Sequence, residues 1–307
     1  MAYRLNRKAL PEENFRRVAL DQLAKAVAEI DDETLSADIS IHQVRKRCKK
    51  LRALVRLYRK PLGHKTYRAL NSHYRDLAAP LSLGRDALAV LDAYDDLKDN
   101  TPDWPDFSLV RRHLTLAKQS AEETAADPRA LLGPARQALV ESRRDIKDIH
   151  FSRKHNADNE KTAAKGMKKT YSRARTAMAT ALKTGRAEDF HEWRKHAKYH
   201  WYHCCLLRGF WPGAMQSRAR LADELGELLG KDHDLHLLDL RLSGPEQDIC
   251  PPERMEELKN LIAQRHKAIR RQATLLGAVL FLETPATALH RIREDDTVEA
   301  TPLLGDA

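Results

Sequence analysis

Apolar residues recur every three to four positions along almost the whole length of this 307-residue chain. In the first such stretch, one helix face holds the apolar residues Phe15, Val18, Leu23 and Val27. Asn14 directly precedes this stretch, and we expect it to cap the helix because a short polar side chain can accept from a free backbone N–H. We find no stretch that alternates apolar and polar residues like a half-buried strand. The sequence therefore predicts an all-α protein.

Glycine and proline interrupt the periodicity and divide it into helices. We expect helices at about residues 14–30, 36–60, 64–81, 85–98, 106–125, 128–149, 162–184, 187–209, 213–242 and 252–283. Residues 284–307 are polar and Thr-rich, and we expect a flexible C-terminal tail there. No segment approaches about eighteen uninterrupted apolar residues, and the basic N-terminus has no apolar signal core. The sequence predicts neither membrane insertion nor export, and its four cysteines form no C-x-x-C pair, which favours a reducing, cytoplasmic setting.

A nine-residue pattern occurs twice in the chain. Residues 41–49 (IHQVRKRCK) and 190–198 (FHEWRKHAK) share the order apolar, His, any, apolar, Arg, Lys, any, small, Lys. Leu-Gly-Arg-Asp at 83–86 and Leu-Gly-Lys-Asp at 229–232 follow, with 42 and 39 residues from the His to the Gly. Two landmarks in the same order at similar spacing predict a duplicated helical unit, with the boundary between copies in residues 100–160.

Basic residues gather on one face of each repeated helix. At about 100° per residue, roughly 140° of arc in the first helix holds His42, Arg45, Lys46, Lys49, Arg52, Arg56 and Arg59. Residues 39–75 contain twelve Lys and Arg and no Asp or Glu, and residues 161–186 contain eight basic residues and no acid. Like charges four residues apart destabilise a helix, so the arrangement favours a bound polyanion, as does the net charge of +10.

Two interpretations of the basic faces stay open at this point. Arginine forks and lysine charges suit repeated phosphate contacts, and a histidine adds a pH-sensitive donor. Alternatively the faces limit aggregation or pair with acids elsewhere, such as Asp92, Asp95 and Asp96. Repetition of the pattern favours phosphate binding. Nucleic acid is the alternative partner, although these faces lack the interleaved aromatic residues that stack on bases.

The sequence resembles the CHAD domain, the conserved-histidine α-helical domain, over about residues 15–281. The resemblance rests on His42-x-x-Arg45-Lys46-x-x-Lys49-Lys50-x-Arg52 and on His191-x-x-Arg194-Lys195-x-x-Lys198. The two Leu-Gly landmarks, of which the second continues as Leu-Gly-Lys-Asp-His-Asp at 229–234, and Lys168-Lys169-x-Tyr171-x-x-x-Arg175 also match. The second copy departs from the first, because Tyr199 and Trp201 stand where the first has Lys50 and Arg52.

This resemblance implies two antiparallel helical bundles with pseudo-twofold symmetry, at about residues 14–125 and 126–283. It also implies binding of inorganic polyphosphate in a basic groove or pore, at polyphosphate granules in some members. The implied contacts are His42, Arg45, Lys46, Lys49, Lys50, Arg52, Arg56, Lys165, Lys168, Tyr171, Arg175, His191, Arg194, Lys195 and Lys198. The departure in the second copy implies an asymmetric groove. Many relatives carry a triphosphate tunnel catalytic domain, which we do not find here, so we expect a non-enzymatic binding protein.

Histidines and acids in the second half invite two rival interpretations. His196, His200 and His203 have helical spacing, but no ordered metal-ligand motif is present, and we expect them to pack rather than bind a metal. Asp232 and Asp234 flank His233, yet we expect these acids to pair with a neighbouring helix rather than to catalyse. The sequence thus predicts no catalytic residue, no metal site and no cofactor.

Overall fold

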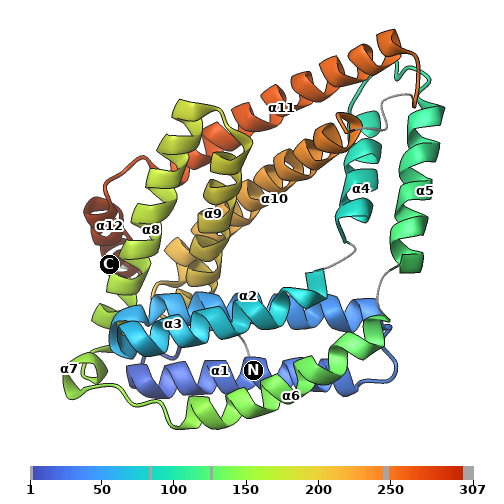
Figure 1. Cartoon of the computed structure of the whole chain (residues 1–307). Helices are drawn as coiled ribbons and strands as arrows, with labels where there is room; N and C mark the ends of the chain where they lie inside the picture. Colours follow the sequence, from blue (N-terminus) through green and yellow to red (C-terminus); the bar gives the residue numbers. More distant parts are fainter. Residues whose placement is uncertain (1–2, 83–84, 125–126, 245–248, 300–307) are drawn as a thin grey trace, which may run out of the picture.

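The computed structural model describes residues 3–82, 85–124, 127–244 and 249–299 (Figure 1). The helices are α1 (Pro11–Asp31), α2 (Ala37–Leu57), α3 (Arg59–Ala78), α4 (Arg85–Asp99), α5 (Ser108–Thr124), α6 (Pro128–Lys147), α7 (Arg153–Asn156), α8 (Asn159–Thr184), α9 (Ala187–Leu207), α10 (Pro212–Leu242), α11 (Pro252–Phe281) and α12 (Pro285–Glu299), with a 3-10 turn η1 (Pro80–Ser82). These described ranges contain no strand. The predicted all-α class is confirmed.

The start of α1 differs from the prediction. The helix begins at Pro11, whose fixed φ suits the first helical position, so Asn14 lies inside the first turn and is no N-cap. Asn14 is buried, accepts from the backbone N–H of Asn6 (2.7 Å) and donates to the carbonyl of Asn6 (2.8 Å). Its side chain therefore anchors the N-terminal segment rather than the helix end. Ser36, where the second helix is predicted to start, is the N-cap of α2, since its hydroxyl accepts from the N–H of Ile39.

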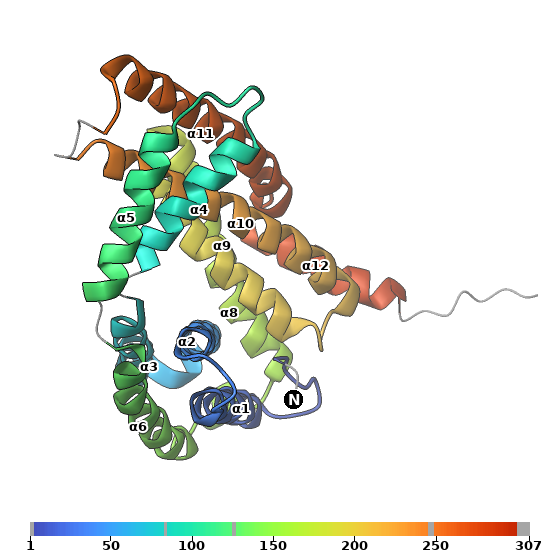
Figure 2. The ribbon, with the colours of Figure 1, turned by 90° about the vertical axis from the view of Figure 1, so that its right-hand side faces the viewer.

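Helices from both halves of the chain build the packed regions. One core lies among α1, α2, α3, α6 and the adjoining ends of α8 and α9. A second core lies among α8, α9, α10, α11 and α12. A third joins α4 and α5 to the C-terminal half of α10 and the N-terminal half of α11. Figure 2 shows this third group at the end of the molecule opposite α1 and α6.

This packing corrects the predicted division into bundles at 14–125 and 126–283. The hairpin of α4 and α5 leaves the first group and packs on α10 and α11, whereas α6 returns to lie along α1 (Figure 1). The exchange buries apolar faces of both halves against each other, which a division by sequence order would leave exposed. The two motif helices hold matching places, since α2 packs between α1 and α3, and α9 between α8 and α10. The duplication itself stays a prediction.

The expected C-terminal tail also differs from the structure. Residues 285–299 form α12, in which Ala288 and Ile292 are buried and pack against the first two cores. The polar composition concealed this, because only one narrow face of α12 is apolar. No single helix in the described part has the length and apolarity to cross a membrane. One pair of helical segments, α11 and Pro285–Ile292, meets the two criteria of length and apolarity when taken together. The axes of these two segments are bent by 68° relative to each other.

Candidate functional site

The two motif helices touch near their C-terminal halves. Nε2 of His203 on α9 lies 2.9 Å from the carbonyl oxygen of Ala53 on α2. Beside this bond Ala53 packs with Tyr199 and Tyr202, and the guanidinium of Arg56 lies over the Tyr199 ring at 4.2 Å from its centroid. This contact brings the basic face of α2 directly against α9.

A narrow hollow lies beside this contact, where α2, α3, α8 and α9 meet, and its cavity volume is only about 10 Å³, the room of a single water molecule. We call it the junction pocket; its lining residues are Arg56, Arg59, Tyr67, Lys169, Thr170, Arg173, His196 and Tyr199. Among the described residues, no carboxylate forms an ion pair with any of its four cations, Arg56, Arg59, Lys169 and Arg173. Four cations in one concave place without acids repel one another, and an anion would relieve that repulsion.

Aromatic rings hold the arginines of the junction pocket in place. Arg56 donates from Nη1 to the Tyr67 hydroxyl (3.4 Å), and the Arg59 guanidinium lies over the Tyr67 ring at 4.7 Å. Cation–π contacts fix a guanidinium without using up its charge or most of its donors. Burial, together with nearby cations including Arg56, lowers the pKa of His196 to about 4, against the opposing effect of Glu192. His196 is therefore neutral near pH 7 and adds a hydrogen-bonding group rather than a charge.

The rest of the α2 face extends from this pocket toward the N-terminus of the helix. His42, Lys46 and Lys49 are exposed, and Arg45 and Arg52 are half-buried. Lys46, Arg52 and Arg56 make no ion pair with a carboxylate in the described part of the chain. The predicted contacts on α2 thus share one accessible face, with a single exception.

The exception is Lys50, which the structure places on another flank of α2. Its ammonium lies over the Tyr3 ring at 5.1 Å from the centroid, while the Tyr3 hydroxyl donates to the Lys50 carbonyl. Burial, followed by repulsion from Arg47, Lys46 and Lys25, lowers the pKa of Lys50 to about 8. Lys50 therefore faces the N-terminal segment and not the junction pocket, so its predicted place in the shared groove is corrected.

The matching cations on α9 are held by acids. Lys198 contacts Asp223 (3.2 Å) and Glu227 (2.6 Å), both on α10. Lys195 pairs with Glu192 one turn before it. Arg194 makes no such pair among the described residues, but its guanidinium lies against the backbone of α10. Acids on α10 and α9 thus distinguish the two motif helices, in addition to the substitutions at Tyr199 and Trp201. The asymmetric groove itself stays a prediction.

Two glycines inside α10 make room for these α9 side chains. A Cβ at position 226 would lie 2.6 Å from Cε of Lys198, and a Cβ at position 230 would lie 3.3 Å from Nε of Arg194. Gly230 belongs to the second Leu-Gly landmark, so close approach of α9 is the physical reason for glycine there. Its predicted counterpart, Gly84, lies outside the described residues.

His191 occupies the opposite end of the α9 face. Its ring lies 4.4 Å from that of His233 on α10. Burial, followed by Arg194 and Lys195, lowers the pKa of His191 despite the opposing charge of Glu192. A phosphate beside this ring would favour the protonated form and so raise the pKa again.

The acid-free stretch on α8 uses different residues from those predicted. Tyr171 is buried, packs on Phe281 and His200, and donates from its hydroxyl to the Glu283 carbonyl. It is a core residue, so its predicted role as a phosphate contact is wrong. An aromatic residue inside a basic motif has the same helical spacing as a core position, which is why sequence could not separate the two.

Lys165, Lys168 and Arg175 are exposed on α8, as expected, but none lines the junction pocket. Lys169 and Arg173 do. Arg175 follows Lys169 by six residues, about 240° around the helix, so Lys168 and Arg175 lie on the other flank. The signal that finds Lys169 and Arg173 is their spacing of four residues within the acid-free stretch, beside the face that packs on α9.

Asp232 pairs with the neighbouring helix, as interpreted. Asp232 is buried and accepts from Nδ1 of His266 (2.7 Å) and Nε of Arg270 (2.8 Å) on α11. Burial raises its pKa, but those two partners outweigh burial and leave the pKa lowered. This pairing links α10 to α11.

The acids proposed as alternative partners of the α2 face bind other cations. Asp96 on α4 pairs with Lys231 on α10 and Arg265 on α11, and Asp95 pairs with Arg111 on α5. These contacts lie within the third core group, away from α2. The alternative in which Asp95 and Asp96 neutralise the α2 face is therefore contradicted.

Two of the three clustered histidines of α9 pack as expected, whereas His196 lines the junction pocket. His200 and His203 are fully buried, and His200 lies among Tyr171, Phe281 and Cys204. Within the described ranges, no three His, Cys, Asp or Glu side chains gather in a way that could hold a metal ion.

Comparison with known proteins identifies the fold that carries this site. A sequence profile of the CHAD domain matches residues 17–243, which is most of the chain. The chain belongs to the CHAD domain family. Among solved structures, the crystal structure of the CHAD domain from the plant Ricinus communis is similar, with a TM-score of 0.52 and 15% sequence identity. The match covers 94% of this chain and 95% of that one. Comparison with curated proteins found no match.

At that identity the likeness to the plant CHAD domain concerns the fold alone. It agrees with the all-α architecture described above and with the extension of the fold beyond residue 243 into α11 and α12. The basic residues of this CHAD domain are therefore judged from their own contacts.

Proposed function

We propose that this CHAD domain binds inorganic polyphosphate, without catalysing its conversion, along the α2 face and across the mouth of the junction pocket. The observation that carries the proposal is the acid-free cluster of Arg56, Arg59, Lys169 and Arg173. Arginine and lysine can contact successive phosphates of a linear chain, and the tyrosine contacts keep two guanidinium groups preorganised. In this proposal the protein acts in the cytoplasm, at polyphosphate granules.

Polyphosphate is favoured over nucleic acid by the form of the site. The junction pocket is small, and its four cations stand close together on the helices that meet there. The rings that line it, Tyr67 and Tyr199, are buried and already covered by Arg59 and Arg56. Single-stranded nucleic acids gain much of their affinity from bases that stack on open rings. A polymer made of phosphate alone needs no such ring.

The first experiment is a binding competition between long-chain polyphosphate and DNA or RNA at about 150 mM salt, where long-range contacts are screened. We expect polyphosphate to remain bound when nucleic acid is in excess. Displacement by an equal concentration of nucleic acid phosphates would show a general phosphate-backbone surface instead.

A pair of variants on one helix tests the location. Lys169→Glu with Arg173→Glu reverses two cations of the junction pocket, and we expect at least about a hundredfold loss of polyphosphate affinity. Lys168→Glu with Arg175→Glu makes the same charge change on the other flank of α8, and we expect less than about a tenfold loss. Equal losses in both variants would contradict the pocket and leave only the total charge as the cause.

A further inference from the structure

A second basic hollow lies where the N-terminal segment crosses the turn between α9 and α10. Its volume is about 680 Å³, and we call it the N-terminal pocket; it is lined by Arg4, Leu5, Asn6, Arg7, Lys8, Arg17, Arg208, Gly209 and Pro212. Five of these nine residues are cationic and none is acidic. None of them belongs to the repeated motif or to the junction pocket.

The backbone of the N-terminal segment is fixed on both sides of this pocket. Leu5 is buried and donates its N–H to the Leu206 carbonyl (2.8 Å) at the end of α9. A Cβ at Gly209 would lie 2.3 Å from the carbonyl oxygen of Leu5, so this crossing requires glycine. On the other side, Asn14 and Asn159 both donate to the carbonyl of Asn6. The pocket is thus built on anchored backbone rather than on a loose terminus.

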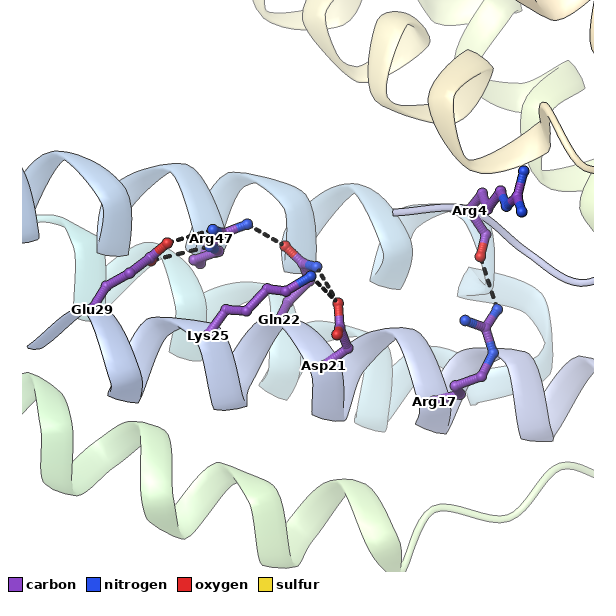
Figure 3. A network of polar contacts seen from close by, with 7 residues as sticks. All are labelled: Arg4, Arg17, Asp21, Gln22, Lys25, Glu29 and Arg47. Carbon is purple, nitrogen blue, oxygen red and sulfur yellow. Dashed lines mark hydrogen bonds and ion pairs between the residues drawn. The ribbon is translucent and has the colours of Figure 1, made fainter. Parts of the chain in front are cut away.

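The cations of the N-terminal pocket retain donors for a ligand. Arg17 donates from Nη2 to the Arg4 carbonyl (2.8 Å) and to Asn14 Oδ1 (3.0 Å), which holds its guanidinium in place. Figure 3 shows the contact with Arg4, whose side chain is directed away from α1. In the described part of the chain Arg4, Lys8 and Arg208 form no ion pair. Arg7 pairs with Glu160 at 3.6 Å and donates to the Phe210 carbonyl, so a ligand would depend on the other four cations.

Two acids of α1 on the C-terminal side of Arg17 are paired with other groups. Asp21 contacts Gln22 and Lys25, and Glu29 contacts Arg47 (Figure 3). On the N-terminal side, Glu13 lies one turn before Arg17 and accepts the backbone N–H of Leu10. The pocket also includes Pro212, the first residue of α10, and a helix N-terminus adds further positive potential.

We propose that the N-terminal pocket binds a compact anion with two or more linked phosphates, either a free short condensed phosphate or the phosphate group of a nucleotide. A concave site suits a small ligand, whereas an extended acidic peptide would need apolar anchoring that these residues do not offer. Arg4, Arg17 and Arg208 match phosphate oxygens through paired N–H donors. This inference does not rest on polyphosphate binding at the junction pocket.

The test is calorimetric titration of the full chain with tripolyphosphate at about 150 mM salt. We expect Arg208→Ala to weaken binding roughly tenfold, and Arg4→Ala with Arg208→Ala roughly a hundredfold. The control is Arg143→Ala with Arg144→Ala, which removes two exposed arginines from α6 and changes the net charge equally. We expect this control to bind like the unaltered protein. If the two double variants bind alike, the pocket assignment is overturned.

Two further measurements separate this pocket from the junction pocket and from general charge. The Lys169→Glu, Arg173→Glu protein should still bind tripolyphosphate at the N-terminal pocket, and loss of all binding there would overturn the inference. Amide exchange in residues 3–10 should slow when tripolyphosphate is added, and not in the Arg4→Ala, Arg208→Ala protein. Unchanged exchange in the unaltered protein, despite binding, would place the ligand elsewhere.

The source of the phosphates is decided by a parallel titration with adenosine triphosphate. Affinity for the nucleotide that equals or falls below that for tripolyphosphate supports recognition of the phosphates alone, and tighter nucleotide binding supports a nucleotide ligand. If hexaglutamate displaces tripolyphosphate at an equal concentration, the proposal is overturned in favour of an acidic peptide.

Discussion

The two motif helices carry the same residue pattern, but their cations are in different states. On α2, Lys46, Arg52 and Arg56 are paired with no carboxylate in the described part of the chain. On α9, Lys198 lies between Asp223 and Glu227, and Lys195 contacts Glu192. A cation that already has a carboxylate partner must give it up, or share it, to contact a phosphate.

The difference comes from the neighbours of each helix. α2 packs between α1 and α3 and approaches α8. α1 supplies Glu29, which pairs with Arg47, whereas α3 and α8 lie largely within acid-free stretches of the sequence. α9 packs on α10, which presents acids toward it. Packing therefore leaves Lys46, Arg52 and Arg56 of α2 without a carboxylate partner among the described residues, whereas Lys195 and Lys198 of α9 are neutralised. The charges in a motif show which residues could bind a phosphate. The packing of the helix decides which of those residues are available to do so.

The largest expected effect comes from a direct comparison of polyphosphate affinity after cations are removed from α2 or from α9. Lys46→Ala with Arg56→Ala removes two cations without a carboxylate partner, and we expect about a hundredfold loss of polyphosphate affinity. Lys195→Ala with Lys198→Ala makes the same charge change on α9, and we expect less than about a tenfold loss because both cations are already paired. Fluorescence anisotropy with labelled polyphosphate measures both, with thermal unfolding as the control for folding. A reversed order would break the comparison.

The contact that joins the two helices should lose stability in acid. Burial is the main cause that lowers the pKa of His203 from 6.5 to about 4, while its bond to Ala53 opposes the shift. As the pH falls, His203 is therefore protonated near pH 6.5 in the unfolded chain but only near pH 4 in the folded chain. We expect the free energy of unfolding to fall by about 2 kcal/mol from pH 6.5 to about pH 5 for this group.

Denaturant unfolding across that pH range measures the effect of His203. His203→Gln keeps a donor for the Ala53 carbonyl and cannot be protonated in this range, so its stability should depend less steeply on pH. An identical pH dependence in both proteins would mean that other groups, such as the buried His200, carry the whole response.

A smaller effect is expected in the opposite direction when the acids beside α9 are neutralised. Asp223→Asn with Glu227→Gln releases Lys198 and removes two negative charges near the bound polymer. We expect roughly a fivefold gain in polyphosphate affinity, measured by the same anisotropy experiment. The matched control is Glu253→Gln with Glu256→Gln, which removes two negative charges from exposed positions at the start of α11. No gain over that control would show that α9 lies outside the binding surface.

The smallest effect concerns the pH dependence of binding at His191. Its pKa is lowered in the free protein, chiefly by burial, and bound phosphate should raise it, so binding takes up a proton. Affinity should therefore rise by a few-fold as pH falls from about 7.5 to about 5.5. His191→Gln should lose that part of the rise, whereas titration of the phosphate chain itself would persist in the variant. The same pH profile in both proteins would remove His191 from the binding surface.

Sequence reasoning succeeded where helical periodicity and breaking residues act locally. The bounds of α8, α9 and α10 lie within a few residues of the predicted ones. Gly185 is the C-cap of α8, and Pro212 is the first residue of α10, so both boundaries can be read from residue type. It failed where a local signal had two meanings. Tyr171 lies in a basic motif but fills the core, and Asn14 has the residue type of a cap but serves a tertiary contact.

The sequence by itself determined the helical class, the family and the acid-free stretches that supply cations without carboxylate partners, because these depend on residue type and on spacing along one helix. Only the tertiary structure decided that α4 and α5 cross to α10 and α11, that Lys169 and Arg173 meet Arg56, and that Lys198 is neutralised. Those outcomes depend on which helices lie side by side. Charges interact through space at a few ångströms, whatever their separation along the chain.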